Sequence, residues 1–102
     1  MILVYITCKD MKEAEKVSRH LLNKKLIACA NIFPIKSLYH WKGKFCDTKE
    51  AVIIAKSVEK LFFQIKKEVK KVHSYSVPEI IALPIIAGNE DYLEWINVEI
   101  ND

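Results

Sequence analysis

Two long extended segments meet at the dipeptide Lys42-Gly43, and this junction constrains the fold more than any other feature of the chain. Glycine adopts positive φ values without steric cost, so the dipeptide favours a tight turn between antiparallel strands. The segment before the turn, 27–41, has 15 residues and spans about 50 Å if extended, whereas a typical strand has about 5–6 residues. The sequence therefore predicts a β-hairpin that overhangs its own sheet.

Hydrophobic periodicity predicts a strand and a helix on each side of this hairpin. A β-prone run at 2–6 precedes a helix that starts at Asp10, with a capping-box-like Glu13, and ends near Lys25. Further along, we expect strands at 27–33 and 35–41, interrupted by Pro34 at a bulge or an edge, and a strand ending at 51–55. The remaining expected elements are a helix at 58–73 capped by Ser57, a strand at 80–87 with Pro84 at an edge or bulge, and a last helix capped by Asn89 that runs to Ile100.

This order of elements is β-α-β-β-α-β plus a C-terminal helix, which is typical of an α+β, ferredoxin-like fold. The chain has 102 residues without a repeat or a linker, so we expect one domain, 1–102. Apolar residues make up 51% of the chain, too many for disorder, yet no apolar run approaches the about 20 residues of a membrane span. We expect no membrane association. The short apolar start and the three cysteines without a C-x-x-C motif favour the cytoplasm.

Strand segments 2–6, 51–55 and 80–87 are apolar at consecutive positions rather than alternating. Both faces of the sheet therefore need cover, although the helices share one side. The long hairpin also indicates a partner chain, because its exposed edge would pair with another strand. The sequence predicts a homo-oligomer on these grounds alone.

Sequence motifs for catalysis and for nucleic-acid binding are absent. Cys29 and His73 are a nucleophile and a base by residue type only, and Cys29 lies in an apolar strand where cysteine is usually inert. We therefore expect no enzyme activity. RNA-recognition modules of this topology stack bases on aromatic residues of the central strands, and the segment 51–55 has none, so no nucleic-acid partner is expected.

Metal binding is favoured by residue type but not by spacing. Thiolate and imidazole groups suit copper and zinc. The candidate ligands are Cys8, Cys29, Cys46, His20, His40 and His73. Taken singly, each of them is better explained by a structural role, since no ligand spacing is present. An oligomer that brought copies of Cys29 or His73 together would form a site that no single chain encodes.

Several short segments, in this order, carry a resemblance to a known family. They are Leu26-Ile27-Ala28-Cys29-Ala30-Asn31, Ser37-Leu38-Tyr39-His40-Trp41-Lys42-Gly43-Lys44, Ile54-Ala55-Lys56, His73-Ser74-Tyr75-Ser76-Val77-Pro78-Glu79-Ile80 and Asn89-Glu90-Asp91-Tyr92-Leu93-Glu94-Trp95. Over almost its full length the chain resembles the CutA divalent-cation tolerance family. The Y-x-W-x-G-K and H-x-Y-x-x-P-E patterns are the most specific.

The resemblance implies a single ferredoxin-like domain in a PII-like homotrimer, acting in tolerance to copper or other divalent cations by binding the metal. Cys29 and His73 match family positions and are the implied metal ligands; Ser74 departs from the usual proline. No organic cofactor is implied. Around an inter-subunit cleft the resemblance places Tyr39, Trp41, Lys44, Lys56, Tyr75 and Glu79. Cys8 and Cys46 match no family cysteine and are interpreted as incidental.

Two alternatives stay open. One is a PII-like sensor or binding module, with a small anionic metabolite held in the clefts by Lys44 and Lys56. The other is a scaffold whose role is the trimer itself. Carboxylates such as Glu79 or Asp91 would complete a harder site for other divalent ions.

Overall fold

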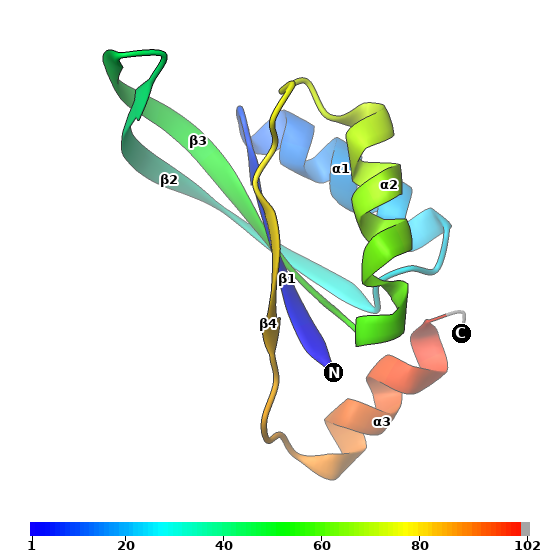
Figure 1. Ribbon diagram of the computed structural model, residues 1–102. Coiled ribbons are helices and arrows are strands. Elements are labelled where there is room, and N and C mark those ends of the chain that lie inside the picture. Colours follow the sequence, from blue (N-terminus) through cyan, green and yellow to red (C-terminus); the bar gives the residue numbers. More distant parts are fainter. Residues whose placement is uncertain (101–102) are drawn as a thin grey trace.

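Strands β1 (Ile2–Cys8) and β3 (Lys44–Ser57) form the centre of a four-stranded antiparallel sheet. The strand order is β2-β3-β1-β4, with β2 (Cys29–Trp41) and β4 (Ile80–Pro84) at the edges. The computed structural model in Figure 1 describes residues 1–100, and the last two residues of the expected domain lie outside this range. The predicted α+β, ferredoxin-like order of elements is confirmed.

Helices α1 (Met11–Asn23) and α2 (Phe62–Val72) pack on one face of the sheet (Figure 1). Every second side chain of β1 points toward them, and together they form the main core; its fully buried members include Val4, Ile6, Cys8, Val17, Leu21, Ile53, Ile65 and Val69. As predicted, Asp10 caps α1, and its carboxylate accepts the N–H of Glu13 at 2.8 Å. Glu13 reaches back in turn to the N–H of Lys9. These bonds fix the start of α1 directly after β1.

The predicted hairpin is confirmed and projects beyond the body of the molecule (Figure 1). Pairing runs unbroken from Cys29 opposite Lys56 to Trp41 opposite Lys44. Lys42 and Gly43 have φ values of 52° and 80°, as a tight hairpin turn requires. Of the two explanations predicted for Pro34, a bulge or an edge, the edge is confirmed, although the strand is not interrupted there. Since β2 is an edge strand, the missing N–H faces no neighbouring strand and the ladder continues.

Three predicted details of the other elements differ from the structure. Ser57 does not cap a helix, because it is the buried last residue of β3 and its hydroxyl donates to the carbonyl of Leu26 at 2.7 Å. A 3-10 turn, Glu59–Leu61, therefore precedes α2. Strand β4 ends at Pro84 rather than at 87 because β1, its one partner strand among residues 1–100, begins at Ile2. Asn89 takes the N-cap position of α3 (Glu90–Glu99), but its side chain donates to Asp91 instead.

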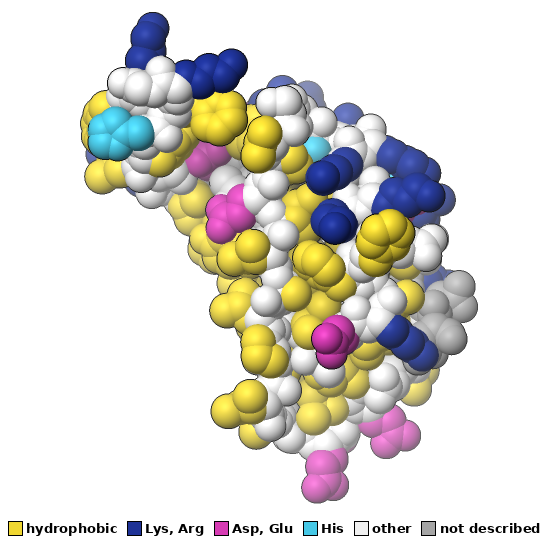
Figure 2. All heavy atoms as spheres, viewed as in Figure 1, with side chains coloured by type: hydrophobic (Ala, Val, Ile, Leu, Met, Phe, Trp, Pro, Cys, Tyr) yellow, Lys and Arg dark blue, Asp and Glu magenta, His cyan; other side chains and the backbone are white. Residues whose placement is uncertain are grey.

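The second face of the sheet carries apolar side chains that no helix covers. Phe33, Ile81 and Leu83 are 38%, 47% and 45% exposed, respectively. Helix α3 lies at the end of the sheet near the start of β1, where it buries Ile96 and Ile100 (Figure 1). Figure 2 shows hydrophobic side chains along the margin of the molecule below the hairpin, whereas Lys and Arg gather over α1 and α2. The predicted uncovered face is present.

Candidate functional site

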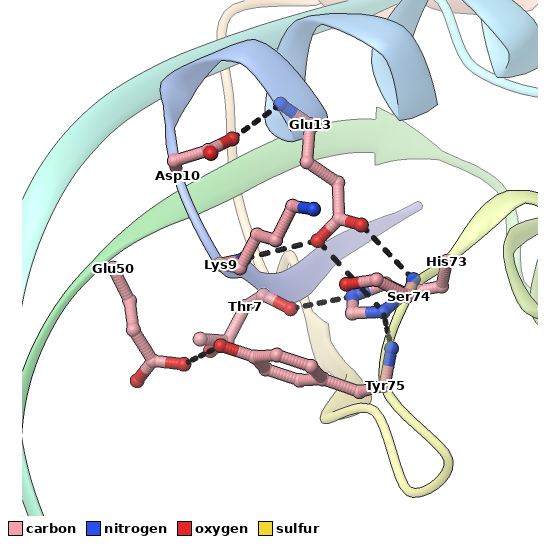
Figure 3. Close-up of polar contacts among 8 residues, drawn as sticks. All are labelled: Thr7, Lys9, Asp10, Glu13, Glu50, His73, Ser74 and Tyr75. Carbon is pink, nitrogen blue, oxygen red and sulfur yellow. Dashed lines mark hydrogen bonds and ion pairs between the residues drawn. The ribbon is translucent and has the colours of Figure 1, made fainter.

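The segment that follows α2 carries the first group of candidate site residues. His73 directly follows Val72, the last residue of α2, and its side chain is fully buried. Its Nε2 lies 2.7 Å from the carbonyl oxygen of Thr7, and its Nδ1 lies 3.0 Å from the backbone N of Tyr75 (Figure 3). A carbonyl only accepts and a backbone N–H only donates, so the ring is the neutral tautomer with its proton on Nε2.

Cys8 and Glu13 complete a buried cluster with His73. One ligand-type atom from each of the three side chains lies within 4.8 Å of the others. The carboxylate of Glu13 approaches Nδ1 of His73 to 4.0 Å and accepts the N–H of Ser74 at 2.9 Å (Figure 3). We call this group the Cys8–Glu13–His73 cluster.

Electrostatics give these side chains different protonation behaviour. Burial opposes ionisation of Glu13, but the hydrogen bonds from Lys9 and Ser74 outweigh it and lower the pKa of this carboxyl. For Cys8, burial and then the negative charge of Glu13 raise the pKa of the thiol to about 12. Cys8 is therefore a protonated thiol in the metal-free protein, and a bound cation would have to displace that proton.

A cavity of about 490 Å³ lies between the 73–79 segment and the half of the hairpin that is nearer the turn. Its lining residues are Thr7, Tyr39, Trp41, Glu50, Ser74, Tyr75, Ser76, Val77 and Glu79. The hydroxyl of Tyr75 donates to Oε2 of Glu50 at 2.5 Å, and the hydroxyl of Thr7 donates to Oε1 of Glu79 at 2.8 Å. Burial, followed by the bond to Glu50, raises the pKa of Tyr75 well above its ordinary value, so this phenol stays a donor.

Four of the six predicted cleft residues, Tyr39, Trp41, Tyr75 and Glu79, line this cavity. The two lysines do not. Lys56 donates instead to the side-chain oxygen of Asn31 on the uncovered face of the sheet. Lys44 lies opposite Trp41 at the tip of the hairpin, outside the lining.

The two predicted metal ligands lie at opposite ends of the sheet. Cys29 is opposite Lys56, which is in turn opposite Leu3 near the start of β1, whereas His73 contacts Thr7 near its end. The sulfur of Cys29 lies 3.4 Å from the hydroxyl of Tyr92 in α3. Within residues 1–100 of one chain, Cys29 and His73 therefore do not share a site.

The sequence analysis did not predict Cys8 and Glu13 as members of the buried cluster, or Glu50 as a lining residue of the cavity. Cys8 had been interpreted as incidental and Glu13 only as a helix cap. Cys8 and Glu13 are far from His73 in the sequence, so no short ligand motif contains all three residues. They meet only because the 73–79 segment packs against the end of β1. Glu50 carried one usable signal: it is a carboxylate directly before the apolar run 51–55.

Comparison with known proteins identifies the family. The family model described as CutA1 divalent ion tolerance protein matches residues 2–99. The chain belongs to the CutA1 family. The divalent-cation tolerance protein CutA of Archaeoglobus fulgidus is 45% identical over 94 residues, 92% of each chain.

Solved CutA1 structures have the same fold. Pyrococcus horikoshii CutA1 superposes with a TM-score of 0.96 at 41% identity and covers 100% of both chains. A second structure, described as the periplasmic divalent cation tolerance protein CutA from Archaeoglobus fulgidus, gives a TM-score of 0.96 at 42% identity and covers 99% of this chain and 100% of that one. The predicted family and fold are confirmed, and the family is named for tolerance of divalent ions rather than for a reaction.

Proposed function

We propose that this protein acts in divalent-cation tolerance as a non-enzymatic, cytoplasmic homotrimer that binds copper or another divalent cation. The observation that carries the proposal is the Cys8–Glu13–His73 cluster, in which three ligand-type atoms lie within 4.8 Å of one another. Thiolate and imidazole are ligands that copper favours, and a carboxylate adds a harder donor for other divalent ions. Membership of the CutA1 family supports a role with such ions.

Binding at this cluster has a cost that the structure makes explicit. The thiol of Cys8 must lose its proton, and His73 must give up a hydrogen bond to free a ring nitrogen. His73 thus remains the implied imidazole ligand, with Cys8 as the thiolate nearest to it. Cys29 is the second candidate, through symmetry-related copies, since it lies on the uncovered face.

The proposed trimer is supported by two features of the single chain. The hairpin extends beyond the sheet, and the principal extents of the molecule are 45 × 26 × 21 Å. The uncovered apolar face is the kind of surface that an obligate oligomer buries.

The proposed cytoplasmic location needs its own test. Among residues 1–100, no helix has the length and hydropathy needed to cross a membrane. A related protein is described as periplasmic. We propose the cytoplasm from the free thiols of the three cysteines. Fractionation of cells expressing the full-length chain checks this, and recovery outside the cytoplasm would contradict it.

Native mass spectrometry tests assembly and metal binding together. The protein is measured metal-free and then with one equivalent of copper per chain. We expect a trimer that takes up a fixed number of ions. Cys8→Ser and His73→Gln should each weaken uptake at least about tenfold, whereas Cys46→Ser, a change in a hairpin cysteine outside the cluster, should not.

The outcomes separate the ligand assignments. Loss of uptake in Cys29→Ser but not in Cys8→Ser would move the site to the uncovered face. Unchanged uptake in all cysteine and histidine variants would remove metal binding by these residues. A monomer would contradict the trimer. The anionic-metabolite alternative gains no support, because neither Lys44 nor Lys56 lines the cavity.

A further inference from the structure

We propose that the cavity of Tyr39, Trp41, Glu50, Tyr75 and Glu79 binds a small organic cation that carries one or two primary ammonium groups. This ligand is separate from the metal proposed above, and the inference does not depend on metal binding. It rests on the charge of the cavity wall, on the burial of one carboxylate and on the aromatic side chains around it.

The charge of the wall has one sign. Of the nine lining residues, only Glu50 and Glu79 carry charged side chains, and none is lysine or arginine. Electrostatic complementarity therefore favours a cation over an anion or a neutral molecule. The volume, about 490 Å³, lies in the range of about 300–1,000 Å³ that is usual for small-molecule sites.

Glu50 is a largely buried carboxylate with a hydrogen bond to only one of its two oxygens among residues 1–100. The residue is 7% exposed, and Oε2 accepts the hydroxyl of Tyr75. Its other oxygen accepts no hydrogen bond within residues 1–100, and solvent reaches this oxygen, because Ser18 Oγ is the only buried side-chain polar atom in this range without a partner. This accessible oxygen is therefore available to an ammonium donor from a ligand, and charge-assisted bonds are the strongest hydrogen bonds in proteins.

Three aromatic side chains complete the wall. Tyr39 and Trp41 are 39% and 47% exposed, and both line the cavity with Tyr75. Aromatic faces attract ammonium groups, and the chain already shows this at Trp41, whose ring has Nζ of Lys42 at 5.9 Å from its centroid. Carboxylates combined with aromatic faces recognise organic ammonium ions rather than compact inorganic ones.

A metal ion fits this cavity less well. Within residues 1–100, the only group of three or more His, Cys, Asp or Glu with converging ligand atoms is the Cys8–Glu13–His73 cluster. Glu50 and Glu79 thus lack a third side-chain ligand of these types. Two carboxylates without a third ligand of these types suit a ligand with two cationic ends, such as a diamine.

Tryptophan fluorescence tests the proposal directly. Trp95→Phe leaves Trp41 as the only tryptophan, so the signal comes from the cavity wall. Metal-free protein is titrated with three four-carbon probes that differ in charge: 1,4-diaminobutane, 1,4-butanediol and succinate. We expect a saturable response to the diamine at millimolar concentration or below, and none to the diol or the dianion.

Charge-neutralising variants locate the binding. In the Trp95→Phe background, Glu50→Gln and Glu79→Gln should each weaken diamine binding by about tenfold or more. The matched control Glu94→Gln removes an exposed carboxylate of α3 outside the cavity and should leave binding unchanged. Glu79 is exposed, so its variant keeps the test valid even if Glu50→Gln does not fold.

Three outcomes would overturn the proposal. One is a response to the diol or to succinate as strong as that to the diamine. Another is equal weakening by Glu94→Gln. The third is no response to the diamine, which is also the expected result if a second copy of the chain fills the cavity. Because metal is absent throughout, these results do not decide the metal proposal.

Discussion

The hydroxyl of Tyr75 donates to Oε2 of Glu50 across 2.5 Å, and this bond ties the segment after α2 to the middle of β3. The backbone N–H of the same tyrosine donates to Nδ1 of His73. Tyr75 therefore contacts His73, a member of the Cys8–Glu13–His73 cluster, and Glu50, a residue of the cavity wall (Figure 3).

Tyr75→Phe removes the hydroxyl donor and leaves a buried carboxylate with no hydrogen bond from the chain. We expect the free energy of unfolding to fall by about 2 kcal/mol, measured by guanidinium unfolding at a fixed protein concentration. Tyr39→Phe is the matched control, because that exposed hydroxyl meets only Thr48 at 3.5 Å, and its effect should stay within about 0.5 kcal/mol. Equal effects would show that the bond to Glu50 contributes nothing.

Glu68 should make the protein sensitive to acid. Its carboxylate contacts His20 at 2.9 Å, Lys71 at 3.0 Å and Lys24 at 3.9 Å, and the bonds from His20 and then Lys71 lower its pKa below the ordinary value of 4.5. A lowered folded pKa gives stability that is complete above 4.5 and is lost as pH falls through the folded value.

The measurement for this prediction is the unfolding free energy as a function of pH. Glu68→Gln should flatten its decline below pH 4.5. Glu15→Gln, which removes an exposed pair with Arg19, should leave the decline intact. An unchanged pH profile in Glu68→Gln would contradict the assignment.

Cys8 should resist thiol reagents in the folded protein. It is fully buried, and its pKa of about 12 leaves far less thiolate than an ordinary cysteine has at neutral pH. We expect alkylation by iodoacetamide, followed by mass spectrometry of peptides, to be more than about a hundredfold slower at Cys8 in the folded protein than in denaturant. Similar rates in the two states would mean that the end of β1 opens readily.

The uncovered face of the sheet should hold the assembly together. Ile81→Lys places a charge on this face, at a side chain that is 47% exposed in the single chain. We expect native mass spectrometry to show smaller species than for the unchanged protein. Leu22→Lys, at a 41% exposed position on α1, should leave the assembly as it was. Dissociation by Leu22→Lys alone would place the interface on the helical side.

Much of the fold follows from local patterns in the chain. Helix α1, the turn at Lys42-Gly43 and the uncovered sheet face were predicted from spacing and turn chemistry, which depend on neighbours in sequence. The incorrect predictions concern positions where contacts between distant segments determine the local structure. The hydroxyl of Ser57 donates to the carbonyl of Leu26 instead of capping a helix, and β4 ends at Pro84 because its partner β1 begins at Ile2.

The sequence by itself determined the order of elements and the family, because short motifs record them directly. Four of the six cleft residues predicted from those motifs are among the nine that line the cavity. Only the tertiary structure decided which side chains meet. The return of the 73–79 segment brings His73 to Cys8 and Tyr75 to Glu50, while the sheet register keeps Cys29 at the opposite end of β1. Such contacts join residues far apart in the chain, and no local spacing encodes them.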